Sequence, residues 1–350
     1  MQSAITARSQ LRGAVIGCGF FAQNHLHAWR EIQGVQLQAV CDRDLDKARR
    51  AGAQFEVPGV YADAAEMFER EELDFVDIVT TMPSHRELVE LAARHRVPVI
   101  VQKPFAPTWT DCIEMVRACR EAAVPLMVHE NFRFQSPMLA VRQTLESGVI
   151  GAPTFGRISF RTGHDIYAGQ PYLATEERFI LLDLSIHLLD IARVFFGEVE
   201  TVQCQTKSVK PGIRGEDMAT VLLRHDSGAM CIVDCSYASK LGSDPFPQTL
   251  VTIEGTRGSL ELRPGFQLDV AHDSDRRVED VSTPLLSWSS QPWHVAQQSV
   301  LNTQRHWVDC LRSGNEPSTS GADNLMTYAL VDAAYESALR CATVQPWRPT

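Results

Sequence analysis

The turn spanning residues 13–22 (GAVIGCGFFA) constrains the fold of this chain more than any other stretch. A short apolar run meets Gly17, Gly19 and Ala22 in the spacing G-x-G-x-x-A, and a helical pattern follows at once. This order suits a dinucleotide pyrophosphate, because Gly17 permits a tight turn and Gly19 lets the backbone approach the phosphates. The N-terminus of the helix adds free N–H groups. A plain glycine turn is the alternative, and the rest of the chain must decide between them.

Residues 1–130 alternate between strand and helix patterns. The expected strands are 11–16, 35–41, 60–61, 74–80, 97–102 and 124–129, and the main expected helices are 23–32, 45–53, 86–95 and 111–123. Near-continuous apolar strands of this kind predict a parallel sheet covered on both faces, so residues 1–130 are expected to form an α/β Rossmann domain that binds NAD. Ligands of such sheets bind beyond the carboxyl ends of the strands. Polar or catalytic residue types stand at several of these ends: Asp42, Thr80, Lys103, Glu130 and Asn131.

Asp42 ends the second expected strand, where a dinucleotide fold places the carboxylate that binds the adenosine ribose hydroxyls. A 2′-phosphate there would meet a like charge, so the sequence predicts NAD rather than NADP. Two alternatives stay open. Asp42 could instead cap the helix at 45–53. Arg43 could stack on the adenine, or it could bind a 2′-phosphate and admit some NADP.

Residues 131–350 have a different pattern. Alternating runs at 154–163, 199–207, 219–224, 229–237 and 250–254 are joined by short turns, which predicts a large, mostly antiparallel open sheet. Helices are expected at 137–147, 179–196, 297–313 and 321–340, whereas 264–292 is too polar to assign. We therefore expect a second, α+β domain over 131–350 that binds the substrate and forms the oligomer. One face of its sheet should pack on helices, and the other should face a ligand or another subunit.

Three residues are candidates for catalysis. Lys103 follows a buried strand and precedes Pro104, and a lysine there could donate to a substrate hydroxyl; a solvated surface lysine is the alternative. Asp183 and His187 are spaced i, i+4 in an apolar helical run, so the carboxylate could orient the imidazole as an acid/base pair. A buried, purely structural pair is the alternative.

The glycine turn, Gln102-Lys103-Pro104 and Asp183-x-x-x-His187 together resemble the Gfo/Idh/MocA family of oxidoreductases, over residues 11 to about 340. The family motif Glu-Lys-Pro is changed at its first position. The expected cofactor site comprises Gly17, Cys18, Gly19, Phe20, Phe21, Asp42, Arg43, Thr80, Thr81, Pro83, His85, Gln102, Lys103 and Asn131. The expected substrate site comprises Lys103, Arg133, Arg161, Asp165, Tyr167, Asp183 and His187, with His164 and Gln170 as further candidates.

The resemblance implies an NAD-dependent sugar dehydrogenase. His187, or Lys103 through a short relay, would take the proton of a sugar hydroxyl, Lys103 would stabilise the alkoxide, and Asp183 would hold His187. The runs QKPFAP and VHENFRFQ resemble the pentose-oxidising branch of the family, for which oxidation at C1 of an aldose would give a lactone. Two alternatives remain: a hydrolase that uses NAD transiently to cleave glycosides, and a non-catalytic sensor of NAD or sugar.

The net charge of −10 argues against nucleic acid as a partner, and no apolar run is long enough to span a membrane. The nine cysteines form no C-x-x-C pair and no HExxH motif occurs, so we expect no metal site. Reduced thiols predict a cytoplasmic protein. The open sheet face predicts a homo-oligomer, either a dimer or a tetramer.

Overall fold

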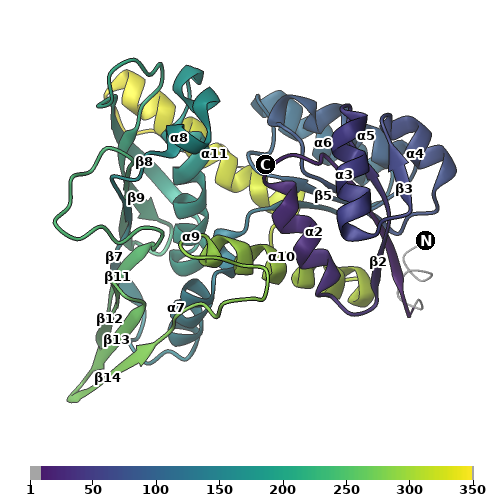
Figure 1. Cartoon of the computed structure of the whole chain (residues 1–350). Coiled ribbons are helices and arrows are strands. Elements are labelled where there is room, and N and C mark those ends of the chain that lie inside the picture. The colour runs from purple at the N-terminus through teal and green to yellow at the C-terminus, as the bar shows by residue number, and fades with distance from the viewer. Residues whose placement is uncertain (1–8, 349–350) are drawn as a thin grey trace. The chain divides into compact units, whose positions relative to one another are not determined.

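The computed structural model describes residues 9–348, which divide into two compact units (Figure 1). The first unit contains residues 9–131 together with 297–325, and the second contains 132–296 together with 326–348. The sequence placed the whole of 131–350 in the second domain. The structure instead assigns 297–325, which follow the second sheet in the chain, to the first unit.

The first unit is built on a six-stranded sheet in the order β3-β2-β1-β4-β5-β6. All its neighbouring strands pair in parallel, which confirms the predicted Rossmann sheet. The strands are β1 (Leu11–Ile16), β2 (Val35–Cys41), β3 (Gly59–Tyr61), β4 (Phe75–Ile78), β5 (Val99–Gln102) and β6 (Leu126–His129). Strands β4, β5 and β6 are buried along their whole length, as a sheet covered on both faces requires.

Each strand from β1 to β5 is followed by a helix, and polar caps start several of these helices. Asp44, Asp63 and Thr108 accept hydrogen bonds from backbone N–H groups in the first turn of α3, α4 and α6. The helices are α2 (Ala22–Arg30), α3 (Leu45–Phe55), α4 (Ala64–Arg70), the 3₁₀ turn η1 (Met82–Ser84) with α5 (His85–Arg94), and α6 (Trp109–Glu121). The loops that carry the candidate cofactor residues therefore lie between the end of a strand and the start of a helix.

The C-terminal part of the first unit covers the edge of its sheet. The side chain of Thr319 donates to the carbonyl of Val128 on β6 (2.7 Å), and Val128 N donates to Thr319 O (2.8 Å). Helix α10 (His294–Ser313) is tied to the end of β6 by Ser299, whose hydroxyl accepts from Asn131 Nδ2 at 2.7 Å. Pairing of an edge strand in this way closes a row of backbone groups that would otherwise be exposed.

The second unit contains an eight-stranded sheet in the order β14-β13-β12-β11-β7-β10-β9-β8. Only β7 and β10 pair in parallel, so the predicted mostly antiparallel sheet is confirmed. The strands are β7 (Pro153–Arg161), β8 (Val199–Lys207), β9 (Met218–His225), β10 (Met230–Ser236), β11 (Leu250–Gly255), β12 (Gly258–Arg263), β13 (Gln267–His272) and β14 (Asp275–Asp280). The unassigned segment 264–292 thus contains two strands. Strand β14 is exposed at every residue, so it lacks the alternation that marks a half-buried strand.

Helix α9 (Ile186–Phe196) packs on β7 and β10 and defines the covered face of this sheet. A Cβ on Gly156 of β7 would lie 2.2 Å from the ring of Phe196, so only glycine allows this approach. On the opposite face, Leu222 is 41% exposed and Met230 is 51% exposed. The remaining helical elements here are the 3₁₀ turn η2 (Phe132–Phe134), α7 (Ser136–Glu146), α8 (Ile166–Gly169), the 3₁₀ turn η3 (Pro171–Thr175), the π-helical turn η4 (Leu181–Ser185) and most of α11 (Gly321–Arg340). No helix among residues 9–348 combines the length and the apolarity needed to cross a membrane.

Candidate functional site

Gly17 and Gly19 of the 13–22 turn are glycine for different reasons. Gly17 has a φ of +99°, and a Cβ there would lie 2.6 Å from Val79 O, so the protein's own backbone requires glycine. A Cβ on Gly19 would meet nothing within 4 Å. Packing within the chain does not explain Gly19, whereas a pyrophosphate approaching the backbone would. Helix α2 starts just after Phe21, whose side chain forms no cap, so the turn fits the phosphates of a dinucleotide.

Asp42 braces this turn from the end of β2. Its Oδ2 accepts from Cys18 N at 2.8 Å and its Oδ1 accepts from Asp44 N at 2.9 Å. Helix α3 is capped by Asp44, so the suggestion that Asp42 caps this helix is wrong. Each carboxylate oxygen of Asp42 keeps a second lone pair, which suits a ribose hydroxyl. Burial raises the pKa of the Cys18 thiol to about 12, so Cys18 contributes through its backbone.

His85 connects two loops of the predicted cofactor site and does not face a ligand. Its fully buried ring places Nδ1 at 3.0 Å from Phe105 O and Nε2 at 3.1 Å from Thr80 O. Burial lowers its pKa, although these carbonyls act in the opposite direction. The expectation that His85 binds the cofactor is therefore corrected: its ring holds the loop after β4 against the loop after β5. Thr81 and Pro83, in the first of these loops, are exposed.

Lys103 follows β5 directly and is half-buried, and its peptide bond to Pro104 is cis. The side chain of Gln102, which was expected at the cofactor, turns into the protein instead. Its Oε1 accepts from Lys103 N at 2.7 Å, and its Nε2 lies 3.1 Å from Nε2 of His25. Both ends of the Gln102 amide are thus used inside the first unit.

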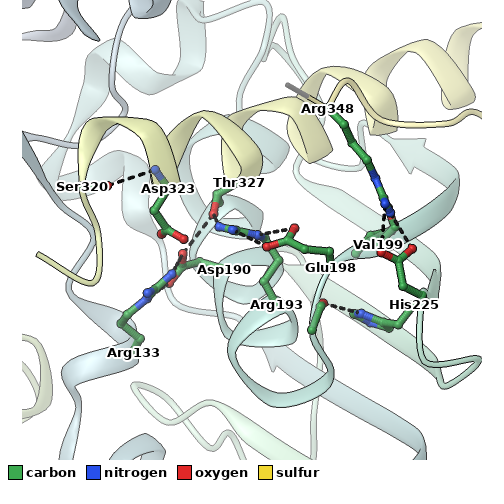
Figure 2. Close-up of polar contacts among 12 residues, drawn as sticks. Arg133, Asp190, Arg193, Glu198, Val199, His225, Ser320, Asp323, Thr327 and Arg348 are labelled. Atoms are coloured by element: carbon green, nitrogen blue, oxygen red, sulfur yellow. Dashed lines mark hydrogen bonds and ion pairs between the residues drawn. The ribbon is translucent and has the colours of Figure 1, made fainter. Parts of the chain in front are cut away.

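Arg133 was expected to bind substrate, but its guanidinium is committed to Asp190 of α9. Arg133 Nε donates to Asp190 Oδ2 at 2.6 Å, and Nη2 donates to Asp190 Oδ1 (Figure 2). Thr327 also donates to Asp190, and Arg193 binds both Thr327 and Glu198. Because this forked pair occupies the Nε–Nη2 edge of the guanidinium, Arg133 is a buried brace for α9.

Asp183 and His187 lie on either side of a change in helix type. Leu181–Ser185 form one turn of π-helix (η4), and the α-helix α9 begins only at Ile186. The wider π-turn changes the angle between Asp183 and His187 from that of the continuous α-helix predicted over 179–196. The ring of His187 is 3% exposed and stacks on Phe132, with centroids 3.9 Å apart and planes at 4°. Asp183 is half-buried, and its backbone N donates to Phe179 O at 2.7 Å.

Glu216 holds the start of this π-turn. Its backbone carbonyl accepts from Ile180 N, and its Oε1 accepts from Leu181 N, both at 3.2 Å. The hydroxyl of Tyr335 donates to the same Oε1 at 2.6 Å. Neither Glu216 nor Tyr335 was found from the sequence, because each is far along the chain from the turn that it supports.

Arg161 lies on the wrong face of its strand for a place beside His187. Phe160, the preceding residue on β7, contacts Phe132, which stacks on His187. Since side chains alternate along a strand, Arg161 points to the opposite face. There its Nη1 lies 3.5 Å from Asp234, within a charged cluster that includes Arg157. The structure thus corrects the expectation that Arg161 binds substrate.

The segment after β7 keeps two expected substrate residues close together. Asp165 caps the short helix α8 through Tyr167 N at 3.2 Å and accepts from Lys210 Nζ at 2.8 Å. The Lys210 ammonium lies 4.4 Å from the centroid of the Tyr167 ring. Burial raises the pKa of Tyr167 to about 12, so its hydroxyl stays protonated. His164, which directly precedes Asp165, stacks on Phe246 with ring centroids 4.2 Å apart.

Two family models match the sequence and identify the class of protein that this fold and site define. Residues 11–130 match the family model described as "Oxidoreductase family, NAD-binding Rossmann fold". Residues 138–261 match the model described as "GFO/IDH/MocA C-terminal domain". The chain belongs to the GFO/IDH/MocA family of oxidoreductases, as its motifs predicted, and it has the family's NAD-binding domain.

Particular relatives resemble this chain over nearly its whole length. It is 55% identical to a D-apiose dehydrogenase of Rhizobium rhizogenes, over 96% of this chain and 97% of the relative. It is 52% identical to a D-apiose dehydrogenase of Paraburkholderia graminis, over 99% of this chain and 92% of the relative. A crystal structure of an oxidoreductase from Agrobacterium radiobacter, in complex with NAD⁺, L-tartaric acid and magnesium, is similar with a TM-score of 0.94. The two sequences are 55% identical, and the match covers 96% of this chain and 98% of that one.

Proposed function

We propose that this chain is an NAD-dependent dehydrogenase that oxidises C1 of D-apiose to the corresponding lactone. The observation that carries the proposal is identity above 50% to two D-apiose dehydrogenases across both units. Conservation of the whole chain at this level supports a shared substrate, whereas a shared fold alone would not. The resemblance of QKPFAP and VHENFRFQ to the pentose-oxidising branch points the same way.

The oxidation removes a hydride from C1 and a proton from the C1 hydroxyl. The bond between C1 and the hydroxyl oxygen then becomes a carbonyl. Bound NAD supplies the acceptor for the hydride. We assign His187 as the base that takes the hydroxyl proton, and Asp183 as the carboxylate that orients His187. Lys103 donates to the substrate oxygen and stabilises the negative charge that develops on it. Asp165 and Tyr167 are retained as candidates for binding the other sugar hydroxyls.

The cofactor-binding residues form a second part of the proposal. We assign the pyrophosphate to the turn at Gly17–Phe21, the ribose to Asp42 and the adenine to Arg43. Thr80, Thr81, Pro83 and Asn131 complete the set. A carboxylate at position 42 should select NAD over NADP through repulsion of a 2′-phosphate.

The direct test is steady formation of NADH when the protein is mixed with NAD and D-apiose. A panel of other aldoses, polyols and inositols provides the comparison, and Lys103→Ala provides the inactive control. A sugar from the panel that is turned over faster than D-apiose would refute the substrate assignment. A lack of net NADH, combined with release of NAD on denaturation and cleavage of a nitrophenyl glycoside, would instead support the hydrolase. None of the relatives described above is named as a hydrolase or a regulator.

The cofactor assignment has its own test, in Asp42→Ala. Loss of the carboxylate should weaken NAD strongly and leave NADP binding unchanged or tighter, because the repulsion is removed together with the hydrogen bonds. Titration with each cofactor, monitored by the quenching of tryptophan fluorescence, measures the dissociation constants of NAD and of NADP for the same protein. An equal loss for the two cofactors would show that Asp42 serves only to brace Cys18 and Asp44.

We further propose a dimer or tetramer in a reducing compartment, the cytoplasm. Leu222 and Met230 leave apolar side chains on the uncovered face of the second sheet, which a second copy would cover. All nine cysteines are free thiols, and burial raises the pKa of several of them, such as Cys231 and Cys235. Light scattering of the purified protein would measure the oligomeric state.

A further inference from the structure

A buried chain of polar side chains ends at the backbone of Lys103. It starts at Asp77 on β4, passes through His25 on α2 and reaches Gln102 at the end of β5. Asp77 and His25 are fully buried and Gln102 is 8% exposed. His25 Nδ1 lies 2.7 Å from Asp77 Oδ2, and Gln102 Nε2 lies 3.1 Å from His25 Nε2. Gln102 Oε1 then accepts from Lys103 N at 2.7 Å.

The direction of each hydrogen bond in this chain follows from its last member. The backbone N of Lys103 can only donate, so the oxygen of the Gln102 amide must face it. The amide nitrogen of Gln102 therefore faces His25 and donates to Nε2. Because Nε2 of His25 accepts, the single proton of the ring lies on Nδ1, where it is donated to Asp77. Every bond thus points toward the Asp77 carboxylate, and only one arrangement of protons satisfies the chain.

We propose that Gln102, His25 and Asp77 are positioning residues that set the orientation of the Lys103 peptide. This inference rests on the proposed function, in which Lys103 acts on the substrate oxygen. The direction in which a side chain leaves the backbone depends on the orientation of its own peptide groups. A chain of directed bonds inside a buried region therefore determines where the Lys103 side chain begins. Trp29 reinforces the far end, because its Nε1 donates to Asp77 at 2.8 Å.

The change from Glu to Gln at position 102 fits this role. A glutamate at 102 would present two acceptor oxygens, one to Lys103 N and one to His25 Nε2. His25 would then need a second proton and would be an imidazolium between two carboxylates. Gln102 supplies both an acceptor and a donor, so the chain is complete with a neutral ring. The residue that departs from the family motif is therefore matched to His25 and Asp77.

The first experiment compares Gln102→Met, His25→Phe and the double variant. Gln102→Met keeps the length of the side chain and removes both hydrogen bonds. We expect a fall in kcat of about 100-fold, the loss that a displacement of about 1 Å can cause at a catalytic group. The affinity for NAD should not change. The double variant should lose no more than the larger single loss, since both changes break one chain.

A matched control separates positioning from general damage to the buried region. Gln304 on α10 also contacts this cluster, with its Nε2 at 3.4 Å from Asp77 Oδ2 and 3.3 Å from His25 O, but it is not on the path to Lys103. Gln304→Met should lower Tm and leave kcat unchanged. A fall in kcat for Gln304→Met that equals the fall for Gln102→Met at equal loss of Tm would overturn the inference.

A further variant, Gln102→Glu, restores the family motif and is expected to change how kcat depends on pH. The groups that face the His25 ring are Asp77 on β4, His129 on β6 at 4.3 Å between centroids, and the new carboxylate on β5; Gln304 on α10 is uncharged. With a carboxylate facing each ring nitrogen, His25 needs a proton on both nitrogens to keep the two hydrogen bonds. The kcat of Gln102→Glu should therefore be near that of the wild type at low pH and fall at higher pH, relative to the wild-type profile. Identical profiles would contradict the chain.

The outcomes also separate this inference from the proposed function. If Lys103→Ala is inactive while Gln102→Met, His25→Phe and Gln102→Glu have the kcat and pH profile of the wild type, the inference fails and the function stands. If Lys103→Ala turns over normally, the catalytic role of Lys103 fails first. Should His25→Phe not fold, the Gln102→Met and Gln102→Glu variants still decide the question.

Discussion

The two units hold their proposed catalytic groups in different ways. In the first unit, a chain of buried side chains from another strand and a helix binds the backbone of Lys103. In the second, His187 lies inside a helix that Arg133 braces through Asp190 and that begins with a π-turn held by Glu216. Lys103 depends on the direction of a few hydrogen bonds, and His187 depends on the packing of a whole helix. Loss of a contact within the Gln102–His25–Asp77 chain should therefore reduce the rate, whereas loss of a contact that holds α9 should reduce stability.

The largest effect is expected for the reacting groups themselves. His187→Asn and Lys103→Met should each lower kcat by about 10³-fold, within the range attributed to positioned acid–base groups. The two variants should differ in stability, because the His187 side chain is buried against Phe132 whereas Lys103 is half-buried. His187→Asn should lower Tm measurably, and Lys103→Met should not. Single-turnover rates and melting curves on both variants test this, and a rate near that of the wild type for either residue would remove it from the mechanism.

Much of the fold was predictable because its strands obey simple rules. Strands β2 and β8 have the predicted bounds, since alternation or continuous apolar character marks them along their length. Strand β14 was missed because it is exposed on both faces and carries no hydrophobic period. The π-turn at Leu181–Ser185 was missed because its residues are as apolar as the α-helix that follows. The local apolar pattern of a sequence indicates which residues are buried. It does not indicate whether the backbone forms α-helical or π-helical hydrogen bonds.

The site was less predictable than the fold because its partners are distant in the sequence. The sequence placed Arg133 and Gln102 at ligands, yet Arg133 pairs with Asp190 and Gln102 with His25. His25 was not among the candidate site residues. The one signal available was Asp77, a carboxylate in the middle of a continuous apolar strand, which a buried sheet tolerates only when partners surround it. A motif identifies which residues are special without identifying what each one touches.

The next largest effect should come from the brace in the second unit. Arg133→Met leaves the fully buried carboxylate of Asp190 without its forked partner, and removing one member of a buried pair costs about 3–5 kcal/mol. We expect a large fall in the free energy of unfolding, measured in urea. At urea concentrations below the unfolding midpoint of the variant, kcat should change by a smaller proportion. Gln102→Met should show the reverse pattern. A lower kcat with unchanged stability for the Arg133→Met variant would contradict this contrast between the two units.

The smallest effect concerns His85, which joins the loops after β4 and β5 beside Lys103. Burial lowers its pKa below that of an unfolded histidine, about 6.5, so the unfolded chain binds the extra proton first as the pH falls. Its contribution to stability is therefore complete above that pH and is lost as the pH falls toward the lowered value. His85→Phe keeps a ring of similar size and removes both the titration and the hydrogen bond. The variant should be less stable at pH 8 by about 1 kcal/mol.

The difference in stability between the wild type and His85→Phe should narrow as the pH falls to 5. Only the wild type has an imidazole at position 85 that can be protonated. Melting temperatures of both proteins across this range measure the change. His27 and His225, whose pKa values burial also lowers, are present in both proteins and cancel in the comparison. Parallel curves for His85→Phe and wild type would show that the ring contributes packing alone.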